Sequence, residues 1–111
     1  MFLEIRTYRL VPGTRADFVR AMREEAIPLL RQAGIRVVDS GPSLSDEDGH
    51  EEAYLIRAFA SLAEHRDQEA AFYGSEAWLK GPREAIVSRI ESYHSVVIEA
   101  PESAAQALTG A

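Results

Sequence analysis

Residues 2–10 read FLEIRTYRL, and this stretch decides the fold because its side chains alternate. Successive side chains of a β-strand point to opposite faces of a sheet. The residues of one face are Leu3, Ile5 and Thr7, and those of the other are Phe2, Glu4, Arg6 and Tyr8. The pattern predicts a first strand with one neutral face and one face that mixes charges with aromatic rings.

A helix is predicted directly after this strand. Residues 11–14, VPGT, are typical of a turn, and Thr14 suits the N-cap position. Apolar residues then recur at helical spacing, at Phe18, Met22, Ala26, Leu29, Leu30 and Ala33. Gly34 suits the position just past the helix end. Pro28 cannot donate a backbone hydrogen bond, so we expect a kink near residues 24–25.

The middle of the chain predicts two further strands joined by an acidic loop. Residues 35–41, IRVVDSG, and residues 53–60, AYLIRAFA, are rich in strand-forming side chains. Between them, residues 42–52 are polar and acidic, without the ligand spacing of a calcium-binding loop. We expect a mobile, solvated loop that includes His50.

The second half predicts a broken helical run and a last strand. Ser61 and Glu64 form a capping box that starts a helix ending near Tyr73. Ser75 caps a short turn that carries Trp78, and Pro82 opens a third helical stretch. Residues 92–100, SYHSVVIEA, are the last predicted strand, followed by a loose, flexible tail over residues 101–111.

The order strand, helix, strand, strand, helix, strand predicts an α+β, ferredoxin-like (βαββαβ) fold with a four-stranded antiparallel sheet. Right-handed crossovers place both helical layers on one face of that sheet. We expect one domain over residues 1–100, because 111 residues suffice for a single core.

Composition excludes several classes of protein. The chain has no cysteine, which removes disulfides and thiolate metal sites and favours a cytoplasmic location. A formal net charge of −6 argues against nucleic-acid binding. The start of the chain is charged, and resembles neither a secretory signal nor a membrane span.

The sheet face without helices needs a cover, because both faces of the predicted strands carry apolar side chains. The simplest cover is a second copy packed sheet against sheet, which predicts a homodimer. The face with Glu4, Arg6 and Tyr8, joined by Arg57, would then line a small-molecule cavity between the two sheets. The alternative is that Glu4 and an arginine form a structural ion pair at the dimer seam.

Several segments together resemble the NIPSNAP family: EIRTY and VPG near the start, PLLRQAGIRVV, YLIRAFASLAEH, and SEAWLKGPREAIVSRIESYHSVVI. The resemblance covers nearly all of residues 2–99. It implies a dimeric α+β barrel, a superfamily that includes cofactor-free monooxygenases, haem-handling enzymes and muconolactone-type isomerases. It supports a small apolar or aromatic ligand, and carries over no catalytic residue.

The candidate catalytic residues are His94 and Tyr8, either of which could act as a general base. Arg6 or Arg57 would stabilise the resulting anion. The candidate substrate-binding residues are Glu4, Arg6, Arg57, Phe59, Tyr73 and Trp78. For the last two, the alternative is a hydrophobic clasp between helices.

His65 and Glu69 are four residues apart on a predicted helix, a spacing that suits two metal ligands. We interpret them instead as a solvated helix face, and we expect neither a metal nor a cofactor. Two functions remain open. One is a cofactor-independent oxygenase or isomerase, which requires a ligand-sized cavity. The other is a non-catalytic interaction module with a filled barrel, whose acidic loop contacts a partner.

Overall fold

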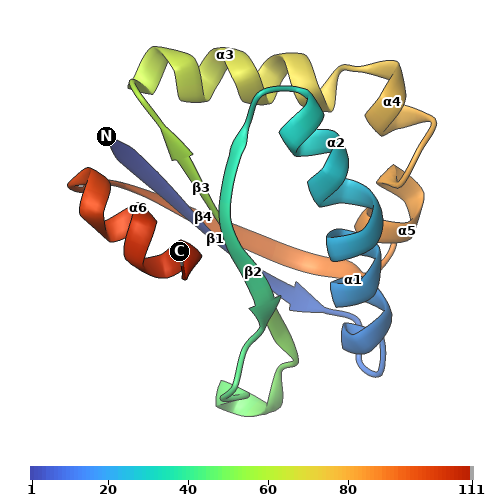
Figure 1. Cartoon of the computed structure of the whole chain (residues 1–111). Helices are drawn as coiled ribbons and strands as arrows, with labels where there is room; N and C mark the ends of the chain where they lie inside the picture. Colours follow the sequence, from blue (N-terminus) through green and yellow to red (C-terminus); the bar gives the residue numbers. More distant parts are fainter. Residues whose placement is uncertain (111) are drawn as a thin grey trace.

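The computed structural model describes residues 1–110 and contains one four-stranded antiparallel sheet. The strands are β1 (Phe2–Leu10), β2 (Arg36–Pro42), β3 (Glu52–Phe59) and β4 (Ile90–Glu99). Their order across the sheet is β2-β3-β1-β4, with β1 paired to β3 and β4, and β2 paired to β3 (Figure 1). The predicted ferredoxin-like α+β fold is confirmed.

The first crossover is a long helical segment with an irregular middle: α1 (Arg15–Ala21), a π-helical turn η1 (Met22–Ala26) and α2 (Ile27–Gln32). Pro28 supplies no N–H to the helix, and just before it the N–H of Ile27 donates to the carbonyl of Met22, five residues back. The predicted irregularity is therefore present as a π-helical turn. Thr14 occupies the predicted N-cap position of α1, but its side chain makes no cap hydrogen bond and its hydroxyl donates to the Val11 carbonyl instead.

The second crossover is the predicted broken run: α3 (Leu62–Tyr73), α4 (Glu76–Leu79) and α5 (Arg83–Val87). Both predicted serine caps are confirmed. Ser61 Oγ accepts the Glu64 N–H at 3.0 Å, and Ser75 Oγ accepts the Trp78 N–H at 3.3 Å. The break after α4 requires glycine at position 81, since a Cβ there would lie 2.3 Å from the Ala77 carbonyl oxygen.

The C-terminal residues differ from the expected loose tail, because α6 (Glu102–Thr109) forms a helix there. Ala105 is fully buried against the face of the sheet opposite the crossover helices, beside Leu3, Val38 and Ala58. Figure 1 shows α6 across the sheet from α1 and α2. An alanine-rich segment has high helix propensity, and contact with the sheet supplies the stability that a short isolated helix lacks.

The acidic loop between β2 and β3 contains a short 3₁₀ turn, η2 (Glu47–Gly49). The loop contacts the first crossover at two points. Asp46 pairs with Arg15 of α1, and Glu51 accepts the backbone N–H of Gly13 at 2.7 Å. None of the helices described over residues 1–110 combines the length and the apolar composition needed to cross a bilayer.

The main core lies between the sheet and the helices of both crossovers. Tyr8, Leu55 and Phe59 of the sheet pack there with Phe18, Leu30 and other helical side chains. The opposite face is covered by α6 at one end only. Val96 and Ile98, near the other edge, remain 47% and 41% exposed. We call this second side of the sheet the open face.

Candidate functional site

The mixed face of β1 lies under the helices, which corrects the expectation that it would face a second sheet. Tyr8 packs against Phe18 of α1, with ring centroids 5.1 Å apart. Glu4 and its cross-strand neighbour Arg57 both contact residues of α3. The expected cavity between two sheets is therefore replaced by one between the sheet and its own helices.

Five charged or titratable side chains meet where β1 and β3 pass under α3. We call them the charge cluster; they are Glu4, Arg6, Arg57, His65 and Glu69. The side chains of Glu4 and Arg57 are 1% and 0% exposed, so this ion pair is in the protein interior. Burial of charges is costly, and here each is opposed by a charge of the other sign.

Arg57 is the centre of the cluster. Its Nη2 lies 2.6 Å from Glu4 Oε1 and 3.2 Å from Glu69 Oε2. Its Nη1 donates to the Tyr73 hydroxyl at 2.8 Å. One buried guanidinium thus joins a strand carboxylate, a helix carboxylate and a tyrosine.

Arg6 forms the second link and is nearer the surface. Its Nη2 contacts Glu4 Oε2 at 2.9 Å and Glu69 Oε1 at 3.3 Å. Its Nε donates to Ser95 Oγ at 2.8 Å, and its guanidinium carbon lies 4.8 Å from the centre of the Tyr93 ring. Contacts from three elements therefore fix the position of this side chain.

The interpretation of His65 and Glu69 as a solvated helix face is wrong. His65 Nε2 lies 3.0 Å from Glu69 Oε2 and 3.5 Å from Glu4 Oε1. Their side chains are only 22% and 14% exposed. The helix turns this pair toward the sheet, where buried Glu4 and Arg57 offer charged partners.

Glu4, His65 and Glu69 each place one potential metal-ligand atom within 4.8 Å of the others. A cation there would have to displace Arg57, whose Nη2 already lies between the two carboxylates. A guanidinium at contact distance repels a second positive charge. The residues present therefore fit an ion-pair network better than a metal centre.

Several of these close contacts are not aligned as hydrogen bonds. Three buried atoms lie at ion-pair distance but form no aligned hydrogen bond within residues 1–110; they are Glu4 Oε1, Glu69 Oε2 and Arg57 Nη2. Buried polar atoms in folded proteins usually form hydrogen bonds. These buried atoms are instead held by ion-pair contacts without aligned hydrogen bonds.

The two carboxylates of the cluster differ in their affinity for a proton. Burial and the hydrogen bond to Glu4 raise the pKa of Glu69 to about 7. Burial also acts to raise the pKa of Glu4, but its hydrogen bond with Glu69 and the charges of Arg57 and Arg6 lower it to about 2. Two adjacent carboxylates resist ionising together, so Glu69 is the member that exchanges its proton near neutral pH.

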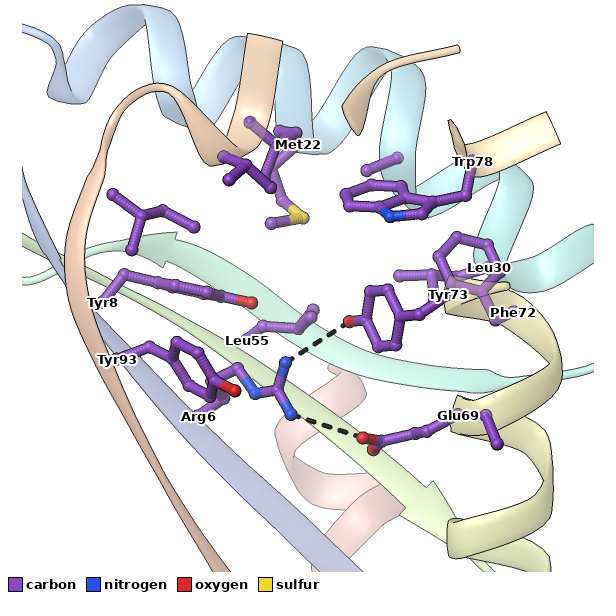
Figure 2. Close-up of a pocket in the computed structure, with 15 residues that line it drawn as sticks. Arg6, Tyr8, Met22, Leu30, Leu55, Glu69, Phe72, Tyr73, Trp78 and Tyr93 are labelled. Atoms are coloured by element: carbon purple, nitrogen blue, oxygen red, sulfur yellow. Dashed lines mark hydrogen bonds and ion pairs between the residues drawn. The ribbon is translucent and has the colours of Figure 1, made fainter. Parts of the chain in front are cut away.

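A cavity of about 450 Å³ adjoins the cluster, between the sheet and the helices. Arg6, Tyr8, Glu69 and Tyr73 contribute polar atoms to its lining, and Figure 2 shows Arg6, Tyr73 and Glu69 converging on one side of it. The remaining lining is mostly apolar: Met22, Ala26, Leu30, Leu55, Ala70, Phe72, Trp78, Ile86, Val87, Ile90 and Tyr93.

Tyr73 and Trp78 pack against each other as the predicted aromatic clasp and also line the cavity. Their rings pack edge to face, with centroids 5.3 Å apart, and Trp78 is buried in the core with Phe72. Both side chains also line the cavity. The aromatic clasp between α3 and α4 is therefore one wall of the cavity.

Three other candidates lie away from the cavity wall. Glu4 and Arg57 are beneath it, in the charge cluster, and do not line it. Phe59 packs edge to face on the His65 ring, with centroids 4.7 Å apart.

His94 does not share a site with Tyr8. His94 pairs with Thr7 in the register of β1 and β4, so it lies on the open face, whereas Tyr8 lies under the helices. A mechanism that used His94 as the base and Arg6 as its anion partner would need groups on opposite sides of the sheet. The residue that sequence reasoning missed is Glu69.

One signal could have identified Glu69. His65, Glu69 and Tyr73 recur every four residues and so form one polar stripe on α3. Glu4, Arg6 and Tyr8 form a second polar stripe on β1. Two such stripes on elements that pack together indicate a shared buried cluster.

The fold and cavity define a class: small α+β proteins with a ferredoxin-like sheet and a pocket beneath the helices. The sequence profile of the NIPSNAP family matches residues 3–101, and the chain belongs to this family. The chain resembles an uncharacterised NIPSNAP domain protein from Burkholderia xenovorans, with TM-score 0.76 and 21% identity over 92% of this chain and 96% of that one.

A protein from Agrobacterium tumefaciens is similar with TM-score 0.77 and 26% identity, over 92% of this chain and 95% of that one. A putative antibiotic biosynthesis monooxygenase from Nitrosomonas europaea shares the fold, with TM-score 0.63 and 19% identity over 90% of this chain and 98% of that one. A comparison with curated proteins gave no match.

Proposed function

We propose that the protein is a homodimeric, small-molecule-binding barrel whose cavity holds an apolar or aromatic molecule with one anionic or hydroxyl group. The reaction class that fits is that of a cofactor-independent oxygenase or isomerase. The observation that carries the proposal is the cavity of about 450 Å³ with Arg6 on one side of an otherwise mostly apolar lining.

The size and lining of the cavity support a ligand of this kind. Pockets for small molecules are typically about 300–1,000 Å³ and mostly apolar, with a few polar groups that orient the ligand. Aromatic rings of Phe72, Tyr73 and Trp78 line one wall, where they can pack against an aromatic body.

The polar side of the cavity supports an oxygen-bearing head group. Arg6 is always charged, and its Nη1 makes only a long contact, 3.4 Å, to the Tyr73 hydroxyl. A carboxylate, phenolate or enolate oxygen would gain a charge-assisted hydrogen bond from this group. The Tyr8 side chain lies on the same side of the cavity (Figure 2).

The likeness to proteins described as putative antibiotic biosynthesis monooxygenases is a likeness of fold. Oxidation of a small aromatic molecule would need the kind of cavity that this chain contains. The alternative of a non-catalytic interaction module predicts a filled interior, and the cavity argues against it.

A second copy of the chain is the proposed cover for the open face. Ile5 lies on it between Ile56 and Val96 in the strand register, and Val96 and Ile98 are exposed on it. Helix α6 covers only the part around Leu3, Val38 and Ala58, against which Ile56 packs. Such an apolar surface favours pairing about a two-fold axis, because one patch then covers an identical patch. Sedimentation of a folded single subunit at micromolar concentration would contradict this pairing.

Ligand binding can be tested with Trp78, which is the only tryptophan of the chain and lines the cavity. The probe is 3-phenylpropionate, an aromatic carboxylate that does not absorb where tryptophan is selectively excited. Saturable quenching is expected in the wild type and should be lost in Val87→Phe, which narrows the cavity. Leu79→Phe is the matched control, because Leu79 is exposed on α4 and does not line the cavity.

The role of Arg6 is tested by comparing 3-phenylpropionate with the neutral 3-phenylpropanol. Arg6→Gln should weaken binding of the carboxylate by about tenfold or more, the value of a hydrogen bond to a charged group, and should alter binding of the alcohol far less. Equal weakening of both probes would contradict the assignment of Arg6 to the head group. Quenching that Val87→Phe leaves unchanged would contradict the cavity as the binding site.

A further inference from the structure

We propose that Glu69 is a catalytic residue, which removes a proton from the carbon next to a carbonyl of a bound aromatic ketone while Arg6 holds the enolate oxygen. This inference rests on the proposed function, because it requires the cavity beneath the helices to bind a small molecule. It adds a reaction, a substrate class and a base that the sequence did not reveal.

The position of Glu69 supports this role. It comes from the middle of α3 and lines the cavity, and its side chain is 14% exposed. Figure 2 shows its carboxylate directed at Arg6. Its Oε2 is buried and lies 3.2 Å from Arg57 Nη2 and 3.0 Å from His65 Nε2.

The base and the group that stabilises the anion are neighbours, as enolisation requires. Arg6 Nη2 lies 3.3 Å from Glu69 Oε1, and Arg6 Nη1 lies 3.4 Å from the Tyr73 hydroxyl. In a ketone, the carbonyl oxygen and the carbon that carries the acidic C–H bond are both bonded to the carbonyl carbon. One ligand can therefore present the oxygen to Arg6 and the C–H bond to Glu69.

The charges around Glu69 come from every element packed against it. β1 contributes Glu4 and Arg6, β3 contributes Arg57, and α3 contributes His65 and Tyr73; Tyr93 of β4 stacks on Arg6. Two guanidiniums balance two carboxylates when both are ionised. Both carboxylates contact both arginines, but Glu4 lies closer to each of them, at 2.9 Å and 2.6 Å against 3.3 Å and 3.2 Å for Glu69. Glu4 therefore keeps its charge, and Glu69 is the carboxylate that can accept and release a proton.

His65 provides a route by which this proton can exchange with water. Its Nε2 lies 3.0 Å from Glu69 Oε2, and its side chain is 22% exposed. Glu69 Oε1 therefore faces Arg6, while Oε2 faces a histidine that reaches solvent.

The step is balanced without an oxidant. The C–H bond breaks, its proton forms an O–H bond on Glu69, and its electron pair enters the carbon–carbon bond of the enolate. The negative charge moves to the carbonyl oxygen, opposite Arg6. Return of the proton to the same carbon gives exchange with solvent, and return to the γ-carbon of a β,γ-unsaturated ketone gives isomerisation to the conjugated ketone.

The test uses 2-tetralone, a bicyclic aromatic ketone with an acidic C–H bond, in deuterated buffer. Deuterium entry is followed by NMR for the wild type, for Glu69→Gln and for the matched control Glu84→Gln, whose carboxylate is exposed on α5. General base catalysis contributes about 10²–10⁴-fold, so Glu69→Gln should lose about 10²-fold or more of the exchange rate above buffer. Glu84→Gln should retain the wild-type rate.

Binding of 2-tetralone is measured separately, through Trp78 fluorescence. If the ketone binds and Glu69→Gln exchanges it as fast as the wild type does, the inference fails and the proposed function stands. If the wild type binds 3-phenylpropionate but neither binds the ketone nor accelerates exchange, the inference fails and the proposed function stands; if it binds neither probe, both fail.

The wild type gives a second test that does not depend on the folding of a variant. Its exchange rate above buffer should rise with pH and level off above about 8, because a base with a pKa near 7 is then fully ionised. The KM for 2-tetralone should change little over that range. A rate that rises tenfold per pH unit without levelling, as for hydroxide, would overturn the assignment.

Discussion

The two faces of the sheet differ more than their amino-acid compositions suggest. Beneath the helices, charged and aromatic side chains interlock around a cavity. On the open face, apolar side chains such as Val96 and Ile98 are exposed. The neighbour of His94 on β1 is the uncharged Thr7. The buried charged residues of the strands therefore lie on the helix-covered side, together with apolar core residues such as Leu55, while α6 covers only part of the open face.

The largest effect should follow loss of the buried guanidinium at the centre of the charge cluster. Arg57→Met removes the more deeply buried of the two guanidiniums that bridge Glu4 and Glu69, and leaves Arg6 to neutralise both carboxylates. Breaking one partner of a buried ion pair costs about 3–5 kcal/mol in the free energy of unfolding. Denaturant unfolding measures it, with Arg20→Met as the control, because Arg20 pairs with Asp17 in solvent.

The control should change stability by about 0.5 kcal/mol or less, as exposed pairs do. If Arg57→Met lowered the free energy of unfolding as little as Arg20→Met, the charge cluster would not act as a buried ion-pair network.

The second-largest loss of stability is expected in the aromatic clasp between α3 and α4. Trp78→Ala removes a buried ring that packs on Phe72 and Tyr73, and should lower the free energy of unfolding by about 3 kcal/mol. It should also weaken binding of 2-tetralone, measured by calorimetry, because the same ring lines the cavity. A large loss of stability with unchanged binding would assign Trp78 to the clasp alone.

The free energy of unfolding should depend on pH to an intermediate extent, and this dependence distinguishes Glu69 from Glu4. The folded-state pKa of Glu69 is raised from 4.5 to about 7, so its stabilising contribution is complete below pH 4.5 and is lost as pH rises to 7. The pKa of Glu4 is lowered to about 2, so its contribution is present above pH 4.5 and is lost below it. The wild-type free energy of unfolding should fall by about 1–3 kcal/mol between pH 5 and pH 8, allowing for partial exposure of Glu69.

Glu69→Gln should flatten this decline, whereas Glu84→Gln should preserve it. Urea unfolding at a series of pH values is the measurement. An equal decline in both variants would show that the titrating group lies elsewhere.

The smallest effect on the folded subunit is expected on the open face. Val96→Lys should change the free energy of unfolding of one subunit by about 0.5 kcal/mol or less, because Val96 is nearly half exposed. The same change should weaken self-association by about tenfold or more, since it buries a charge in the proposed dimer contact. Sedimentation across a concentration series distinguishes the two, and unchanged association would exclude the open face as the contact.

The strand pattern of residues 2–10 predicted which side chains share a face, but not which face the helices would cover. An alternating sequence assigns side chains to two faces of a strand, but it does not say which of the two faces the helices cover. The helical stripe containing Phe18 and Leu30 could pack on either set, and the structure pairs it with Tyr8 and Leu55.

The sequence predictions missed two features, the helix α6 and the buried position of Glu69, for different physical reasons. α6 is short, and its stability depends on contact between Ala105 and residues far away in the sequence, such as Leu3. Glu69 looks solvated on its own helix, and only the approach of Glu4, 65 residues earlier in the chain, makes it part of a buried cluster.

The central claim is that ligands bind on the helix-covered side of the sheet and not on the open face. Methyl NMR during titration with 3-phenylpropionate compares the two sides directly, because isoleucine and valine methyls lie on both. The account predicts shifts at Ile86, Val87 and Ile90, with Ile5, Ile56 and Val96 unchanged. Shifts confined to the second group would contradict it.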